Sequence, residues 1–97
     1  MTAIFIAYNQ AYYEEIQGLL EQQGVRGFTR WNEITGRGSV TGEAHYGTHT
    51  WPTFNDAILT FVDDDKVDEL LTSVRKLDKR NEEVGIRAFV WGVEKMV

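Results

Sequence analysis

Residues 2–24, TAIFIAYNQAYYEEIQGLLEQQG, combine a short apolar run with an amphipathic repeat. The run Thr2–Ala7 is apolar and rich in branched and aromatic side chains, which at this length favours a strand. Asn9 is a suitable helix N-cap because its side-chain oxygen can accept from a free backbone N–H, and Gly24 stands where a helix C-terminal glycine is expected. Apolar residues between these two signals recur at helical spacing, which predicts a helix whose buried face carries Tyr12, Tyr13, Ile16, Leu19 and Leu20.

The rest of the chain repeats this order of strand and helix. Side-chain patterns predict strands over Val25–Ile34, Phe54–Val62 and Gly85–Val93. Three aspartates at 63–65 begin a second helix and basic residues end it, a charge distribution that the helix dipole favours. The predicted buried stripe of this helix consists of Val67, Leu70, Leu71, Val74 and Leu77.

Two consecutive β-α-β units predict an α+β fold, the ferredoxin-like βαββαβ sandwich. Right-handed crossovers place both helices on one face of a four-stranded antiparallel sheet. We expect a single domain over residues 1–97, with an extended loop at 35–53. The first and last strands are apolar on both faces, so Phe5, Phe89 and Trp91 would lie on the face without helices. A second copy of the chain is the expected cover, which predicts an oligomer.

Composition narrows the function classes. Of 97 residues 42% are hydrophobic and 26% charged, as in ordinary globular proteins. The absence of cysteine excludes disulfides and thiolate metal sites, and with no secretion signal we expect a cytoplasmic protein. No apolar run is long enough for membrane insertion. A net charge of −5 argues against nucleic-acid binding, which needs a concentrated basic surface, but leaves small anionic ligands open.

The stretch Ile34–Pro52, ITGRGSVTGEAHYGTHTWP, is long, glycine-rich and holds both histidines. Such long connections are usually functional or disordered. Backbone N–H groups around Gly36, Gly38 and Gly42 would form a concave anion site, aided by Arg37 and by Arg87 of the same or a neighbouring chain. The alternative is that these glycines only permit a tight turn.

The second half of this loop suggests a metal site instead. Glu43, His45 and His49 lie within seven residues, and imidazole with carboxylate suits zinc, copper or nickel. The alternative is that both histidines are solvent-exposed and unligated, because such spacings arise by chance. Catalysis is not expected: there is no cysteine nucleophile, and Ser39 with His45 and Glu43 defines no triad without geometry.

The run Gly36-Arg37-Gly38-Ser39-Val40-Thr41-Gly42 resembles the G-F-G-R-Q-x-G opening of the loop in PII signalling proteins, the nitrogen regulatory protein P-II family. The order of elements resembles that family along essentially the whole chain. The resemblance implies a compact homotrimer with inward-facing sheets and ligand clefts between subunits. It also implies a regulatory target, such as a membrane transporter or an enzyme. CutA-like trimers share the architecture, so fold alone does not define the function.

The chain departs from that family at its phosphate-binding groups. Ser39 and Val40 replace an arginine and a glutamine, and Thr53 replaces a lysine. Of the T-G-x-x-G-D-G-K turn before the last strand, only Gly85 and Arg87 have counterparts. Most phosphate-binding groups of the family are thus missing, and we do not assign ATP or 2-oxoglutarate binding from the resemblance. We expect a trimeric ligand-sensing regulator whose effector is not identified by the sequence, the two candidates being an adenine nucleotide and a divalent transition metal. The alternative is a CutA-like or efflux-associated metal-binding trimer. The expected ligand residues are Gly36, Arg37, Gly38, Ser39, Gly42, Gly85 and Arg87.

Overall fold

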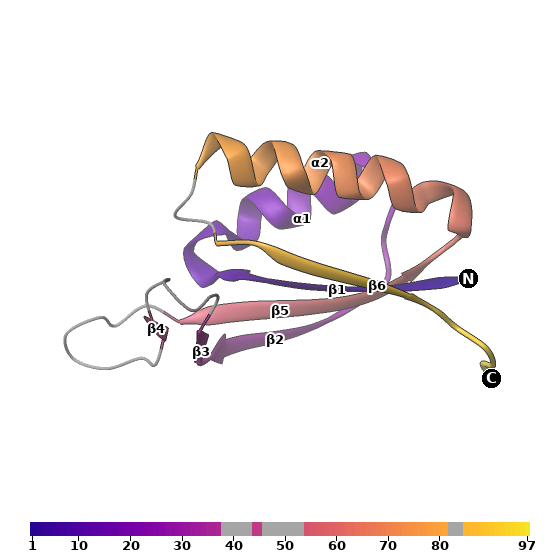
Figure 1. The fold of residues 1–97 in the computed structure, drawn as a ribbon, viewed down its shortest axis with the longest axis horizontal. Helices are drawn as coiled ribbons and strands as arrows, with labels where there is room; N and C mark the ends of the chain where they lie inside the picture. The colour runs from indigo at the N-terminus through magenta and orange to yellow at the C-terminus, as the bar shows by residue number, and fades with distance from the viewer. Residues whose placement is uncertain (38–43, 46–53, 82–84) are drawn as a thin grey trace.

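A computed structural model describes residues 1–37, 44–45, 54–81 and 85–97 of the chain. Four strands form one antiparallel sheet in the order β2-β5-β1-β6: β1 spans Thr2–Asn9, β2 Phe28–Ile34, β5 Asn55–Val62 and β6 Arg87–Gly92. Helices α1 (Tyr13–Gln22) and α2 (Val67–Arg80) both cover one face of this sheet (Figure 1). The predicted α+β ferredoxin-like sandwich is thus confirmed. Within the described ranges no helix is long and apolar enough to cross a membrane.

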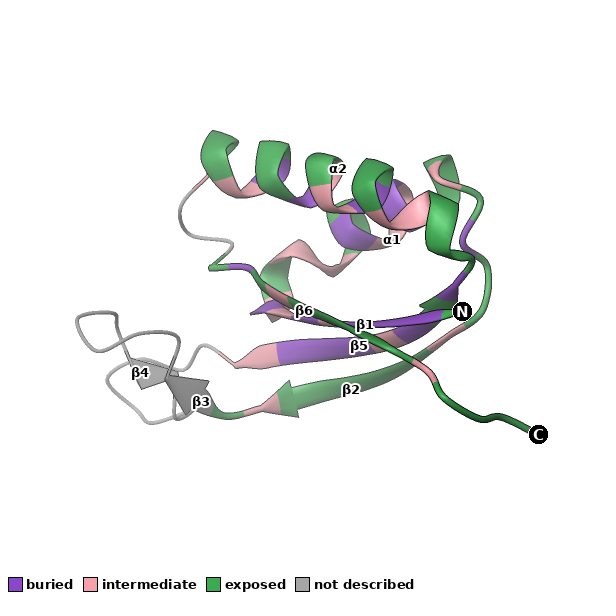
Figure 2. Cartoon of the chain, turned by 45° about the vertical axis from the view of Figure 1, so that its right-hand side comes forward, coloured by how far each residue is buried: buried purple, intermediate pink, exposed green. Residues whose placement is uncertain are grey.

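The face of the sheet under the helices forms the hydrophobic core. Residues of β1 and β5 pair along the whole length of both strands, with Ile6 opposite Ile58. By strand alternation every second residue of these strands faces the helices, and these residues are buried. Figure 2 shows much of β1 and β5 in purple, the colour of buried residues. The helices contribute branched aliphatic side chains to the same cluster. Its fully buried members include Ile4, Ile6, Tyr8, Ile16, Leu20, Ile58 and Leu70.

The first helix differs from its prediction only near its ends. Asn9 accepts from Ala11 N–H as predicted, but the turn it caps is the short 3-10 helix η1 (Gln10–Tyr12). At the other end Gly24 has a φ of 74°, and Val25 N–H still donates to a helical carbonyl, that of Leu20. Because Gly24 and Val25 belong to the end of the helix in this way, β2 begins at Phe28 rather than at Val25. Tyr12 and Tyr13 are partly buried rather than buried.

The start of the second helix also differs. Asp64 and Asp65 lie in a 3-10 turn, η2 (Asp64–Lys66), and α2 begins at Val67. Asp64 accepts from the Thr2 hydroxyl at 2.5 Å and lies 3.1 Å from the N-terminal ammonium. These two partners lower the pKa of Asp64. The helix dipole is therefore not the whole explanation for the aspartates, since Asp64 also joins the N-terminus to the helix layer.

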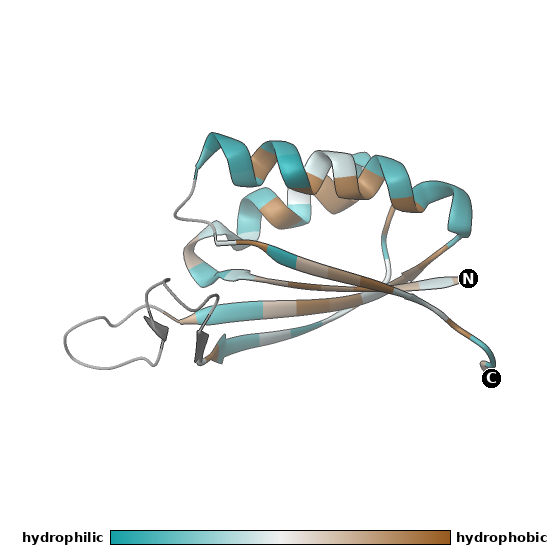
Figure 3. Cartoon of the chain, in the orientation of Figure 1, coloured by the Kyte–Doolittle hydropathy of each residue, from teal (hydrophilic) through white to brown (hydrophobic). Residues whose placement is uncertain are grey.

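The face of the sheet away from the helices remains apolar and exposed. Phe61, Phe89 and Trp91 expose 52%, 57% and 49% of their surface, and Trp31 of β2 lies on the same face. Phe5 and Phe89 are directly paired across β1 and β6. Figure 3 shows apolar residues along the edge strand β6 as well as along the central strands. The predicted apolar open face is therefore present in the single chain.

Candidate functional site

The glycine-rich loop begins with a short hairpin. Two-residue strands β3 (Gly36–Arg37) and β4 (Ala44–His45) pair antiparallel, with Gly36 opposite His45 and Arg37 opposite Ala44. The chain therefore turns back on itself within the loop that we predicted as the ligand site. Of the predicted ligand residues, three lie outside the described residues: Gly38, Ser39 and Gly42.

A β-bulge connects this hairpin to the sheet. Trp31 pairs with Ala57, but the next pair along the two strands is Ile34 with Asn55. Two residues of β2 thus stand opposite one residue of β5, which adds a local bend and twist. Glu33 in the bulge has a φ of 56°, a left-handed conformation that is uncommon for a residue other than glycine. The bulge redirects the chain just before the glycine-rich segment.

The other half of the predicted site lies at the start of β6. Gly85 has a φ of 58°, which glycine adopts without strain, and it leads into Ile86 and Arg87. Arg87 pairs with Ala7 of β1, is exposed, and donates from Nη1 to the carbonyl of Ile86 at 3.0 Å. By strand alternation Arg87 shares the open face with Phe89 and Trp91.

The two halves of the site lie at the same end of the sheet but at its opposite edges. The hairpin follows β2 and Arg87 begins β6, and both β5 and β1 lie between these edge strands. Three strand spacings amount to about 14 Å. Within a single chain, Gly36 and Arg37 therefore lie across the width of the sheet from Gly85 and Arg87. Whether Arg87 acts with the loop of the same or of a neighbouring chain stays a prediction.

The metal hypothesis falls mainly on residues without a described position. Glu43 and His49 lie outside the described ranges, and His45 is described only through its backbone pairing with Gly36. Among the described residues no group of three His, Cys, Asp or Glu side chains could hold a metal ion. The metal site therefore stays a prediction.

Sequence reasoning missed a buried polar cluster beside the bulge. Asp56 is fully buried, and its Oδ2 accepts from Arg30 Nε at 2.9 Å, from Arg30 Nη2 at 2.6 Å and from the Tyr8 hydroxyl at 3.3 Å. The Arg30 guanidinium also stacks on the Tyr13 ring at 3.4 Å. Burial and then the Asp56 charge raise the pKa of Tyr8 far above its usual range. The available signal was Asp56 itself, a carboxylate on the same strand face as Ile58.

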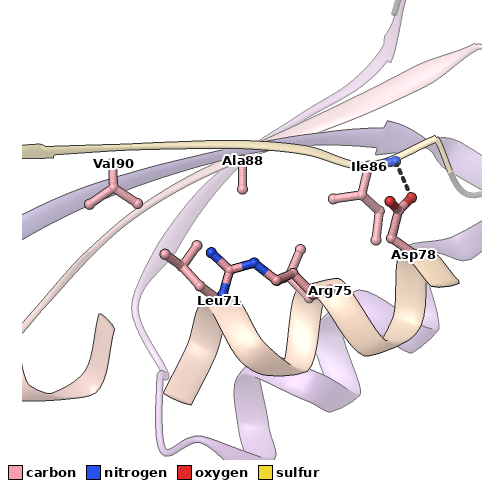
Figure 4. A pocket seen from close by; sticks show the side chains of 7 residues that line it. Leu71, Arg75, Asp78, Ile86, Ala88 and Val90 are labelled. Atoms are coloured by element: carbon pink, nitrogen blue, oxygen red, sulfur yellow. Dashed lines mark hydrogen bonds between the residues drawn. The ribbon is translucent and has the colours of Figure 1, made fainter. Parts of the chain in front are cut away.

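A groove between α2 and β6 is a separate feature. It has a volume of about 350 Å³, and Figure 4 shows side chains from both elements facing it, with Asp78 accepting from Ile86 N–H at 3.3 Å. Its floor is mostly apolar and it opens on the helix side of β6, whereas Arg87 lies on the open face. We therefore do not place the anion site in this groove, whose lining is Leu71, Val74, Arg75, Asp78, Ile86, Ala88 and Val90.

The fold and the loop together define a class of protein: a ferredoxin-like sandwich with a glycine-rich hairpin between its second and third long strands. The family model for nitrogen regulatory protein P-II matches residues 1–97. The chain belongs to this family, as the glycine pattern and the order of elements predicted. No curated protein sequence matches it.

Solved structures of CPII, a PII-like protein from Thiomonas intermedia, are similar to the chain. CPII bound to ADP and bicarbonate is 23% identical with a TM-score of 0.75, and the match covers 93% of this chain and 82% of CPII. The form bound to ADP, AMP and acetate is 22% identical with a TM-score of 0.73, covering 92% and 81%. The apo form is 20% identical with a TM-score of 0.71, covering 93% and 85%. At these identities the similarity establishes the shared fold.

Proposed function

We propose that the protein is a cytoplasmic homotrimeric regulator that binds a small ligand in clefts between neighbouring copies. Each cleft combines the glycine segment of one copy with Gly85 and Arg87 of the next. Ligand binding changes the conformation of the loop and so its docking onto a partner protein, either a membrane transporter or an enzyme. The role is regulatory and not enzymatic, which agrees with the family to which the chain belongs.

The separation of the two half-sites is the observation that carries this proposal. Both halves lie at one end of the sheet, but on edge strands that β5 and β1 keep apart. An edge of one copy placed beside the opposite edge of another would complete the site. The exposed aromatic residues Phe61, Phe89 and Trp91 supply an apolar face for such an assembly, since monomers rarely leave contiguous patches of this kind open.

The ligand class that we propose is an adenine nucleotide with a small carboxylate-like anion. CPII has been solved with ADP and bicarbonate and with ADP, AMP and acetate. In this chain, backbone N–H groups from Gly36 to Gly42 and at Gly85 are suited to oxyanions, and Arg37 and Arg87 supply cations. With fewer cations than the family pattern has, we expect weaker nucleotide binding than in members that keep the phosphate-binding turn.

Sedimentation velocity and isothermal titration test the proposal together. We expect a mass of three 11.1 kDa chains at micromolar concentration and heat on titration with ADP, increased by bicarbonate. A monomer at that concentration would contradict the assembly. Heat with Zn²⁺ but none with ADP would contradict the nucleotide class and support the metal alternative at Glu43, His45 and His49.

A further inference from the structure

An ion pair between the partly exposed Arg30 guanidinium and the buried Asp56 carboxylate lies beside the bulge from which the loop departs. The pairs Trp31–Ala57 and Ile34–Asn55 leave Asp56 facing the two bulged residues of β2. The Asp56 side chain turns to the helix side of the sheet, where Arg30, two residues before the first bulged residue, reaches it diagonally. The ion pair therefore joins β2, just ahead of the bulge, to the residue of β5 that lies opposite the bulge.

The ion pair also connects the bulge to the rest of the core. Tyr8, which stands opposite Asp56 on β1, donates to the same Oδ2 atom, and Tyr13 at the start of α1 stacks on Arg30. Hydrogen bonds thus join residues of three strands, and the stacked Tyr13 ring adds one helix to the cluster. A buried carboxylate can be held only by such partners, because its unpaired charge is strongly unfavourable away from water.

The geometry of the ion pair leaves one acceptor unused. Arg30 donates twice to Oδ2, whereas Oδ1 is buried and has no hydrogen-bond partner among the residues that the structure describes. A guanidinium and a carboxylate can instead pair through both oxygens in a fork. The Arg30–Asp56 pair does not adopt this fork, and both of its hydrogen bonds meet at the single oxygen Oδ2.

We propose that Arg30 and Asp56 are positioning residues that hold the β2 bulge and so aim the Gly36–Arg37 strand at the ligand cleft. Neither residue contacts the ligand. They act through the bulge, since Arg30 precedes Trp31 and Asp56 follows Asn55, the two residues whose pairs bound it. The effect on ligand binding rests on the proposed role of the loop. The effect on the bulge and on the Gly36–Arg37 strand does not depend on that role.

The test removes the ion pair without leaving a buried charge behind. The triple variant Tyr8→Phe, Arg30→Met and Asp56→Leu replaces the cluster with apolar side chains of similar size, and such replacements are often tolerated. Amide hydrogen exchange, followed by mass spectrometry, then compares residues 31–37 with the core of β5. We expect exchange in residues 31–37 to become faster by about tenfold or more, with β5 unchanged.

The same variant should bind ADP about tenfold more weakly, within the usual range of coupling between distant groups. Thr60→Val is the matched control, because Thr60 is also buried on β5 and donates to the Gly27 carbonyl at 2.6 Å, far from the bulge. This control should leave exchange in residues 31–37 and ADP affinity unchanged.

Arg30→Lys provides a second variant in case the triple variant does not fold. Lysine keeps the charge balance but cannot donate from two nitrogens or stack as a plane. We expect intermediate exchange in residues 31–37. Unchanged exchange there in both folded variants, or in Arg30→Lys when the triple variant fails to fold, would overturn the inference. If the wild-type chain binds no ADP, the proposed ligand is wrong, while the exchange comparison still decides the role of the ion pair.

Discussion

The two faces of the sheet are built from similar residues but have opposite surroundings. On the helix side, Ile6 and Ile58 pack under α1 and α2 and are fully buried. On the other side, Phe61 of β5 and Phe89 of β6 each expose more than half of their surface. The buried face therefore stabilises the single chain, whereas the exposed face is the one through which we propose that copies of the chain associate.

The largest expected effect comes from the helix side. Ile58→Ala removes a fully buried side chain and should lower the free energy of unfolding by about 2–5 kcal/mol. Urea denaturation followed by circular dichroism measures this change. A loss below about 0.5 kcal/mol, as expected for an ordinary surface position, would contradict the claim that the face under the helices stabilises the chain.

A second substitution tests the face of the sheet that no helix covers. Phe89→Asp places a charge in the proposed interface and should weaken association by about 2 kcal/mol or more, the range of an interface hot spot. Sedimentation velocity should show smaller species. Thr72→Asp, on the exposed side of α2, is the control and should sediment as the wild type does. Unchanged sedimentation of Phe89→Asp would mean that the open face is not where copies meet.

A smaller effect should come from the edge strand β2, most of whose residues are exposed. Glu33 has a positive φ, so Glu33→Gly removes backbone strain and should stabilise the fold by about 1 kcal/mol. For a chain of this size the melting temperature would rise by about 4–8 °C. Asn32→Gly in the same bulge is the control and should not stabilise. A lower melting temperature for Glu33→Gly would contradict the left-handed conformation.

The polar cluster on the helix side should make the stability of the fold depend on pH. The raised pKa of Tyr8 means that the folded state keeps its proton when the unfolded state loses it. The resulting stability is complete below the pKa of free tyrosine, about 10, and is lost as the pH rises above it. Urea midpoints between pH 8 and 11 should fall less steeply for Tyr8→Phe than for the wild type. Parallel curves would contradict this assignment.

Much of the fold could be predicted because its signals are periodic and local. The short apolar run Thr2–Ala7 and the helical spacing through Leu20 each describe one element without reference to another. The start of β2 at Phe28 was not predictable in this way, because a hydrogen bond from Val25 N–H to the Leu20 carbonyl extends the helix cap. That hydrogen bond depends on the backbone conformation at the end of the helix, where Gly24 has a φ of 74°.

The site was less predictable because its parts depend on register and strand order. Arg30 and Asp56 are 26 residues apart, and only the pairing of β2 with β5 makes them neighbours. The distance between the glycine segment and Arg87 likewise follows from the order β2-β5-β1-β6. The glycine pattern and the presence of Gly85 and Arg87 were visible in the sequence, but their placement on opposite edges was not.

A mixing experiment with two variants measures whether one ligand site needs two copies of the chain. Arg37→Ala and Arg87→Ala should each weaken ADP binding by about tenfold or more, the value of a charge-assisted hydrogen bond. The two variants are then unfolded, mixed in equal amounts and refolded. If each site takes Arg37 from one copy and Arg87 from the next, random assembly restores about a quarter of the sites to wild-type affinity. Titration that detects no restored sites would contradict a cleft shared between copies.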